Sequence, residues 1–500
     1  MTYILSFQLF AKIQAMITSL STPRIVRLSI LLLAPVIVLN LEVVLAQQNA
    51  KRPNILLIIA DDMSMNAGIY GEKAIKTPGM DNLALNGVYF KNAFCTASSC
   101  SPSRASILSG KYPHELEEGA NLWGTFPAKY PNYTKTLAQA GYKIGLTGKG
   151  WGPGQALPGG YKENPAGPDF KSFDDFLAKL PNDAPFCFWI GSSDPHRPYE
   201  AALTKKTAID KSNIKVPAWL PDNETVREDM MDYLAEVKRY DETIEHAIAL
   251  LKQKGMFENT FIIVTSDNGM PFPRAKANVY TSASNVPLIM SWGNRFTEGK
   301  SYNELITLAD LAPTILDAAN VKATAEMTGK SLLPLLLDNK KDKRFKEVFL
   351  ERERHANVRT NMLGYPVRAI RTEDYLYVEN LKPERWPAGD PDYNVPPSPF
   401  GDIDNSGSKE FLIRNRNNTT YAKWVNASLE KRPAVELYNL KKDPDELNNV
   451  ATNSENQKII KKLKKRLDEW RRHTNDPLVG TTEDIFDTYP YYGRQQAGKE

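Results

Sequence analysis

Short apolar runs alternate with helical patterns of apolar residues from Pro53 to about residue 345. Strands buried on both faces of a sheet are typically short apolar runs, whereas surface helices carry apolar residues three and four positions apart. The alternation predicts an α/β fold in which helices flank both faces of a large, mostly parallel sheet. We expect strands at residues 54–60, 142–147, 186–190 and 261–264, and helices at residues 133–140, 224–254 and 305–319.

The character of the chain changes after about residue 345. Aromatic and charged residues dominate the short runs 375–378 and 435–438, residues 382–407 are rich in Pro, Gly and Asp, and a Lys-rich helical pattern follows at about 455–473. We therefore expect a catalytic domain over residues 47–345 and a smaller C-terminal α+β domain with an antiparallel sheet over residues 346–500.

The N-terminal residues have the three-part pattern of a secretory signal peptide: two arginines, an apolar run over residues 28–39, and the segment 44–46 ending in Ala. The apolar run is shorter than the roughly 20 residues that a spanning helix needs. Cleavage is therefore favoured over a retained anchor, and no stable membrane span is expected. We predict a signal peptide over residues 1–46 and an exported protein, periplasmic or secreted. Translation from Met16 rather than Met1 stays open.

The composition is that of a folded globular protein, because 42% of the 500 residues are hydrophobic and 24% are charged. The formal net charge is only +4 and no basic stripe is visible, which argues against a nucleic-acid partner. Three cysteines cannot form a disulfide framework, so any special role of a thiol belongs to a single residue. We expect Cys95 and Cys187 to be buried and inert.

Oxygen-bearing side chains follow two of the predicted strands directly. Asp61 and Asp62 follow the first strand, and Asp267 and Asn268 follow the strand at residues 261–264. In open α/β sheets, ligands bind outside the carboxyl ends of the strands, so function is expected along that edge. Three carboxylates and one amide suit a hard divalent cation such as Ca²⁺ or Mg²⁺. The alternative for an Asp pair at this place is a cap of the next helix.

Residues 98–104, Ser-Ser-Cys-Ser-Pro-Ser-Arg, predict a turn leading into a short helix with Cys100 at its start. A helix N-terminus lowers the pKa of a thiol, and its N–H groups would form an anion site together with Arg104. This arrangement predicts nucleophilic chemistry on an anion. A buried, unreactive cysteine is the alternative.

The segment 100–110 resembles the signature of the formylglycine-dependent sulfatases, a family of the alkaline-phosphatase-like superfamily. It has the pattern C-x-P-S-R followed by a helix that ends in a small residue and Gly, and the two acidic pairs flank it in the order of that family. The resemblance extends over nearly the whole chain from residue 52. It looks closest to sulfatases of the heparan N-sulfatase (sulfamidase) type and to bacterial polysaccharide sulfatases, through the segments 92–94, 194–197, 265–269 and 365–368.

The resemblance implies a set of site residues. In that family a formylglycine-generating enzyme oxidises the cysteine, here Cys100, to formylglycine (3-oxoalanine), whose hydrate attacks sulfur. His196 would protonate the leaving atom, and Lys276 would contact the sulfate. One Ca²⁺ per chain is implied. The implied metal ligands are Asp61, Asp62, oxidised Cys100, Asp267 and Asn268, and the implied catalytic residues are Cys100, Arg104, Lys149, His196 and Lys276.

Two positions depart from the family pattern. Many sulfatases have a histidine two residues after the lysine, where this chain has Trp151. The acceptor of the second proton is therefore open between His114 and His355. Lys276 stands where the sulfamidases have arginine, whose planar guanidinium makes bidentate contacts that an ammonium does not. The choice between an N-sulfate and an O-sulfate substrate is therefore open as well.

These observations predict an exported sulfatase that hydrolyses sulfate groups of a sulfated oligo- or polysaccharide. The substrate would be an O-sulfate ester of a marine algal polysaccharide, such as ulvan or carrageenan, or the N-sulfate of glucosamine. A phosphodiesterase or phosphonate hydrolase on the same fold is one alternative. It is disfavoured because the chain has only five histidines and none beside the Asp pairs, so a His-rich zinc site is not expected. A non-catalytic glycan-binding relative is the other alternative.

Overall fold

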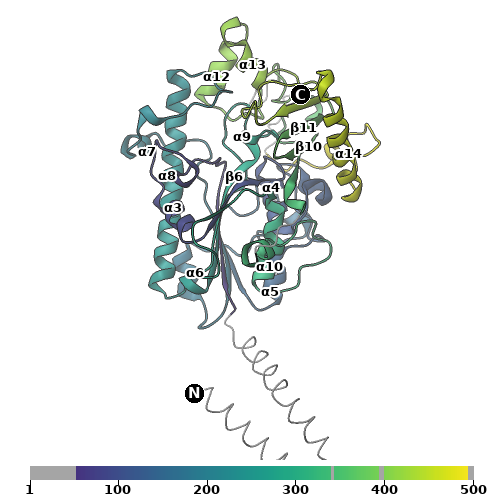
Figure 1. The fold of residues 1–500 in the computed structure, drawn as a ribbon. Coiled ribbons are helices and arrows are strands. Elements are labelled where there is room, and N and C mark those ends of the chain that lie inside the picture. The colour runs from purple at the N-terminus through teal and green to yellow at the C-terminus, as the bar shows by residue number, and fades with distance from the viewer. Residues whose placement is uncertain (1–51, 339–342, 394–398, 494–500) are drawn as a thin grey trace, which may run out of the picture. The chain divides into compact units, whose positions relative to one another are not determined.

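The computed structural model describes residues 52–338, 343–393 and 399–493 and is built around an eight-stranded sheet (Figure 1). Its strands are β1 (Asn54–Ala60), β2 (Val88–Phe94), β3 (Lys143–Gly148), β4 (Phe186–Gly191), β5 (Thr260–Ser266), β6 (Asn285–Ser291), β7 (Lys300–Tyr302) and β8 (Ile306–Thr307). The strand order is β3-β4-β1-β5-β6-β2-β7, with β8 paired to β2. Every pairing is parallel except those of β6 with β5 and with β2. The predicted mostly parallel sheet is confirmed.

The α-helices of the described residues are α3 (Pro78–Leu85), α4 (Cys100–Ser109), α5 (Tyr133–Gln139), α6 (Phe173–Lys179), α7 (Ala201–Lys206), α8 (Glu224–Gln253), α9 (Thr281–Ser284), α10 (Leu311–Ala318), α11 (Leu333–Asp338), α12 (Gly407–Arg414), α13 (Ala422–Ser428) and α14 (Gln457–His473). Alternate side chains of β1 face opposite layers. Ile55, Leu57 and Ile59 pack with residues of α4, α5 and α10, whereas Leu56 and Ile58 pack with residues of α3, α6 and α8. Helices thus cover both faces of the sheet, as predicted (Figure 1).

The predicted helix 224–254 is confirmed as α8, which begins after the N-cap Asn223, whose side chain accepts a hydrogen bond from the Val226 N–H at 3.1 Å. The helix expected at residues 305–319 begins later than predicted. Residues 306–307 form β8, and Thr307 is extended and donates its N–H to the Asp310 carboxylate. Pairing with β2 thus holds the first residues of this apolar run in a strand, and the α-helix starts only at Leu311.

A second, antiparallel sheet follows, with β9 (Glu347–Arg352), β10 (Val367–Thr372), β11 (Tyr375–Asn380) and β12 (Val435–Asn439) in the order β12-β11-β10-β9. One face packs against α14, where Tyr377 and Leu437 contact Leu467 and Trp470 in one apolar cluster. The predicted antiparallel sheet and Lys-rich helix are therefore present. The domain boundary at residue 345 stays a prediction.

The predicted signal peptide lies outside the described residues. In the part of the chain that the structure describes, no helix has both the length and the apolar character that crossing a membrane requires. The chain's three cysteines are all described, all buried and all free.

Candidate active site

The residues that follow the neighbouring strands β1 and β5 form a group of oxygen-bearing side chains, Asp61, Asp62, Asp267 and Asn268, which is called the acidic cluster below. Ala60 of β1 lies beside Ser266 of β5 in the parallel register, so the residues that follow each strand meet. The Asp62 N–H donates to Asp267 Oδ1 at 3.1 Å, and Asn268 Nδ2 donates to Asp62 Oδ1 at 2.7 Å. Asp61, Asp62, Asp267 and Asn268 are all buried. The structure thus brings together the four oxygen-bearing residues that the sequence predicted.

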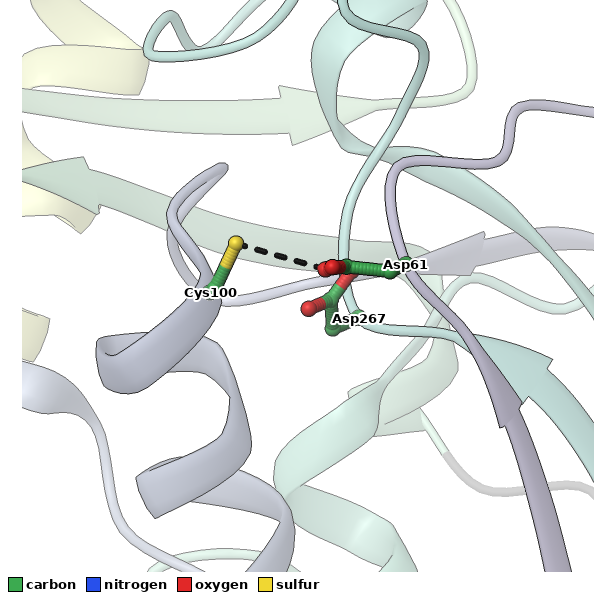
Figure 2. Close-up of side chains that lie close together, drawn as sticks. All are labelled: Asp61, Cys100 and Asp267. Atoms are coloured by element: carbon green, nitrogen blue, oxygen red, sulfur yellow. Dashed lines mark hydrogen bonds between the residues drawn. The ribbon is translucent and has the colours of Figure 1, made fainter. Parts of the chain in front are cut away.

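Cys100 is the first residue of α4 and points into this cluster. Its thiol lies 3.4 Å from Asp61 Oδ1 (Figure 2). Asp62 Oδ1 is 3.9 Å from the same sulfur. The helix is fixed there by its own side chains, because Ser103 donates to the Asp267 carbonyl at 2.5 Å and Arg104 Nε donates to Asp267 Oδ2 at 2.7 Å. The C-x-P-S-R segment therefore places position 100 beside the carboxylates.

The thiol itself is not activated, which corrects the expectation of a lowered pKa. Burial raises the pKa of Cys100 well above its usual value, and the carboxylate of Asp61 adds to this effect. The neighbouring ammonium groups of Lys149 and Lys276 act in the opposite direction but do not outweigh the effect of burial. The unmodified cysteine is a neutral thiol in this site.

Cationic side chains pair with the carboxylates. Lys149, just after β3, places its Nζ 2.5 Å from Asp61 Oδ2, and Lys276 places its Nζ 2.7 Å from Asp62 Oδ2. Although burial opposes their charge, the neighbouring carboxylates raise the pKa values of both lysines, so both are ammonium ions at neutral pH. For Asp61, burial is likewise outweighed, and Lys149 and Arg104 hold its pKa below the usual range.

His196 approaches the same cluster from the segment after β4. A ring N–H at Nδ1 donates to the Arg197 carbonyl, and Nε2 faces Asp62 Oδ2 at 3.6 Å. The side chain is 32% exposed, whereas Asp62 is fully buried. His196 thus lies between the cluster and solvent, where an entering substrate would meet it.

The donor set fits a hard divalent cation. Asp61, Asp62 and Asp267 offer carboxylate oxygens, and Oδ1 of Asn268 is buried without a hydrogen-bond partner among the described residues. A buried amide oxygen without a donor is costly unless another positive group satisfies it. Burial also raises the pKa of Asp267 despite the guanidinium of Arg104, and the neighbouring carboxylates of Asp61 and Asp62 add to this effect. Oxygen ligands of this kind are those that Ca²⁺ and Mg²⁺ prefer.

The two candidate proton acceptors occupy different places. His114 is buried away from the cluster, with Nδ1 bonded to Glu351 and Nε2 2.9 Å from Thr474 Oγ1. His355 Nδ1 lies 2.8 Å from the hydroxyl of Ser99, the residue next to Cys100. Burial lowers the pKa of His355 to about 3, so its imidazole is neutral at neutral pH.

One residue at the site was missed by the sequence reasoning. Asp404 lies in the stretch between β11 and α12, and its Oδ2 accepts a hydrogen bond from Lys276 Nζ at 3.1 Å. Carboxylate oxygens of Asp62 and Asp404 and a ring nitrogen of His196 all lie within 4.8 Å of one another. No motif surrounds Asp404, so only the fold reveals its place.

Two protein-family models match the chain: one described as "Sulfatase" over residues 53–321, and one described as "N-sulphoglucosamine sulphohydrolase, C-terminal" over residues 274–390. N-sulphoglucosamine sulphohydrolase of Homo sapiens is 28% identical, over 89% of this chain and 95% of that protein. An ulvan-active sulfatase of Formosa agariphila is also 28% identical, over 86% of this chain and 82% of that protein.

The solved structure of BT4656 in complex with its substrate D-glucosamine-2-N,6-O-disulfate has the same fold. It aligns with a TM-score of 0.60 at 21% identity, over 87% of this chain and 100% of the solved chain.

Proposed function

Since this chain belongs to the sulfatase family and is a sulfuric ester hydrolase, we propose that it removes sulfate groups from a sulfated glycan through a formylglycine at position 100. The observation that carries the proposal is the position of Cys100, 3.4 Å from Asp61 at the start of a helix that Arg104 ties to Asp267. Three buried carboxylates and three cationic side chains converge on this one residue.

Cys100 has the position of a nucleophile, but its unmodified thiol is a weak one, and oxidation of this residue would remove the disagreement. A neutral, buried thiol is a weak nucleophile, because the reactive form is the thiolate. As formylglycine, position 100 would supply a geminal diol, of which one hydroxyl attacks sulfur and the other, on losing its proton, expels sulfate. Its formation requires a formylglycine-generating enzyme as a partner during maturation.

The surrounding residues have distinct roles in this proposal. Asp61, Asp62, Asp267 and Asn268 would hold one Ca²⁺, which polarises a bound sulfate. Lys149, paired with Asp61, and Lys276, paired with Asp62, would stabilise the charge on the sulfuryl oxygens.

The leaving atom would receive its proton from His196. Its Nε2 faces the cluster and its Nδ1 proton is engaged by the Arg197 carbonyl, which fixes the orientation of the ring. In the protonated form, the ring would donate from Nε2 to the departing oxygen or nitrogen.

The proposed substrates are the N-sulfate of glucosamine and O-sulfate esters of algal polysaccharides such as ulvan or carrageenan. Two relatives, each 28% identical to this chain, support one choice each, because their names refer to N-sulphoglucosamine and to ulvan. The signal-peptide pattern of residues 1–46 supports export to the periplasm or the medium, where such polymers are met.

The test is sulfate release by protein made together with a formylglycine-generating enzyme. The panel contains N-sulfated glucosamine, 6-O-sulfated glucosamine, and ulvan and carrageenan oligosaccharides. We expect release from at least one of them, and a mass below that of the cysteine form for the tryptic peptide 92–104. Cys100→Ala should abolish release, and the matched control Cys187→Ala, in the core of β4, should retain it. The peptide also contains Cys95, so an active preparation whose peptide has an unmodified cysteine at position 100 would refute the proposed nucleophile.

A further inference from the structure

Asp404 and His196 form the open side of the site. The carboxylates of Asp61, Asp62 and Asp267 are buried, whereas the side chains of Asp404 and His196 are 27% and 32% exposed. Since these two groups lie within 4.8 Å of each other and of Asp62, a substrate whose sulfate enters the cluster passes directly beside Asp404. The carboxylate is therefore placed against the atoms next to the scissile bond and not against the sulfate itself.

The segment around Asp404 is held on both sides. Asp402 is buried, and its Oδ2 accepts hydrogen bonds from Arg352 at 2.5 Å and from Arg359 at 2.6 Å. The carbonyl of Ile403 accepts one from Lys409 Nζ at 2.8 Å. Asp404 thus projects from an anchored backbone, which gives its carboxylate a defined position at the mouth of the site.

The carboxylate retains hydrogen-bonding capacity for a ligand. Lys276 donates to Oδ2, and no donor to Oδ1 is found among the residues that the structure describes. An ionised carboxylate only accepts hydrogen bonds, and it repels other anions. A sugar hydroxyl or amine next to the scissile sulfate satisfies this acceptor, whereas a second sulfate at that place meets a like charge.

We propose that Asp404 is a specificity-determining residue, which selects sugars with a hydroxyl or amine donor beside the scissile sulfate and rejects sugars with a second sulfate there. The inference rests on the proposed function, since it describes how that same site chooses its substrate. The Lys276 ammonium donates to both Asp62 Oδ2 at 2.7 Å and Asp404 Oδ2 at 3.1 Å, so it links the buried carboxylates to the residue that selects the sugar.

The test compares Asp404→Asn with the wild-type protein on matched substrates. The first is the panel member from which the wild-type protein releases sulfate best, and the second is the same sugar with another sulfate on the neighbouring hydroxyl. A charge-assisted hydrogen bond contributes about 10- to 100-fold, so kcat/KM for the first sugar should fall by about that factor. Release from the disulfated sugar should stay the same or rise.

Two further variants separate selection from folding. Asp404→Glu keeps the charge and should still reject the disulfated sugar, and Asp392→Asn, an exposed position in the same stretch, should behave as wild type. An equal fall for both sugars in Asp404→Asn would show a purely positioning role and overturn the inference. The inference would also be overturned if Asp404→Asn left kcat/KM unchanged for both sugars. A wild-type protein that releases no sulfate from any panel member would instead overturn the proposed function.

Discussion

Arg104 connects the helix that begins at the predicted nucleophile Cys100 to the predicted metal ligand Asp267. Its replacement by lysine therefore tests how the site is held together. The guanidinium is fully buried. Its Nε donates to Asp267 at 2.7 Å, and its Nη1 donates to the carbonyls of Lys149 at 2.7 Å and Gly150 at 3.0 Å. Arg104→Lys keeps the positive charge but replaces this planar fork by a compact ammonium.

The cost follows from the acceptors that lose their donor. If the ammonium pairs with Asp267, the Gly150 carbonyl loses the donor that Arg104 provides, whereas the Lys149 carbonyl keeps the indole N–H of Trp189 at 3.1 Å. An unsatisfied buried acceptor costs about 1–3 kcal/mol. We expect the free energy of unfolding to fall by about 2 kcal/mol. Since the segment after β3 that carries Lys149 loses its contacts with the guanidinium, sulfate release should fall as well.

The assay is reversible urea unfolding of the wild type, of Arg104→Lys and of a matched control, Arg472→Lys, on the exposed face of α14. The control should unfold within about 0.5 kcal/mol of the wild type, as is usual for surface substitutions. If Arg104→Lys lowered the free energy of unfolding by less than about 1 kcal/mol, the reasoning would be refuted. The positive charge alone, without the hydrogen bonds of the planar guanidinium, would then be enough to stabilise the site.

Three further outcomes are expected. Saturating Ca²⁺ should raise the melting temperature of chelator-treated protein, by the equivalent of about 2.7 kcal/mol at a hundredfold excess over Kd, and no shift would contradict the proposed site. Burial opposes ionisation of Asp476, but Arg368 and Arg471 lower its pKa, so the stability that its charge contributes is present above about pH 3.9 and lost as the pH falls further. Asp476→Asn should therefore cost about 3 kcal/mol in urea unfolding at pH 7 and progressively less towards pH 3, and a constant difference would count against this ion pair. His355→Asn should lower kcat about 100-fold at an unchanged melting temperature, whereas His114→Asn should lower the melting temperature at an unchanged kcat, and the reverse pattern would contradict the placement of the two histidines.

The part of the site at the carboxyl ends of the strands and at the start of α4 could be predicted from the local sequence. Asp61 and Asp267 each follow a buried apolar run, Lys149 follows the edge strand β3, and parallel strands bring their carboxyl ends to one edge whatever lies between them. The C-x-P-S-R pattern likewise predicted a helix beginning at Cys100. Hydrophobic periodicity and motif spacing are sufficient to predict these positions, because the end of a strand in a parallel sheet has little conformational freedom.

Properties that depend on surroundings could not be predicted in the same way. The helix N-terminus at Cys100 predicted a lowered thiol pKa, but burial and the neighbouring Asp61 raise it. Neither the burial nor the proximity of Asp61 can be predicted from the residues around position 100. The start of the helix at residues 305–319 was misplaced for a related reason, since the pairing of residues 306–307 with β2 outweighs their apolar spacing.

The substrate-facing half of the site comes from segments without a regular pattern. Ser99 meets His355 across 256 residues, and Lys276 meets Asp404 across 128. Both partners lie after residue 345, in loops whose course is set by buried ion pairs such as Arg352–Asp402 rather than by periodicity. The reaction class could therefore be inferred from the family resemblance of residues 100–110 together with the acidic residues at the sheet edge. The choice of sugar depends on residues such as Asp404, whose neighbours exist only in the folded chain. This division makes the stretch between β11 and α12 the place where a change of substrate should be sought.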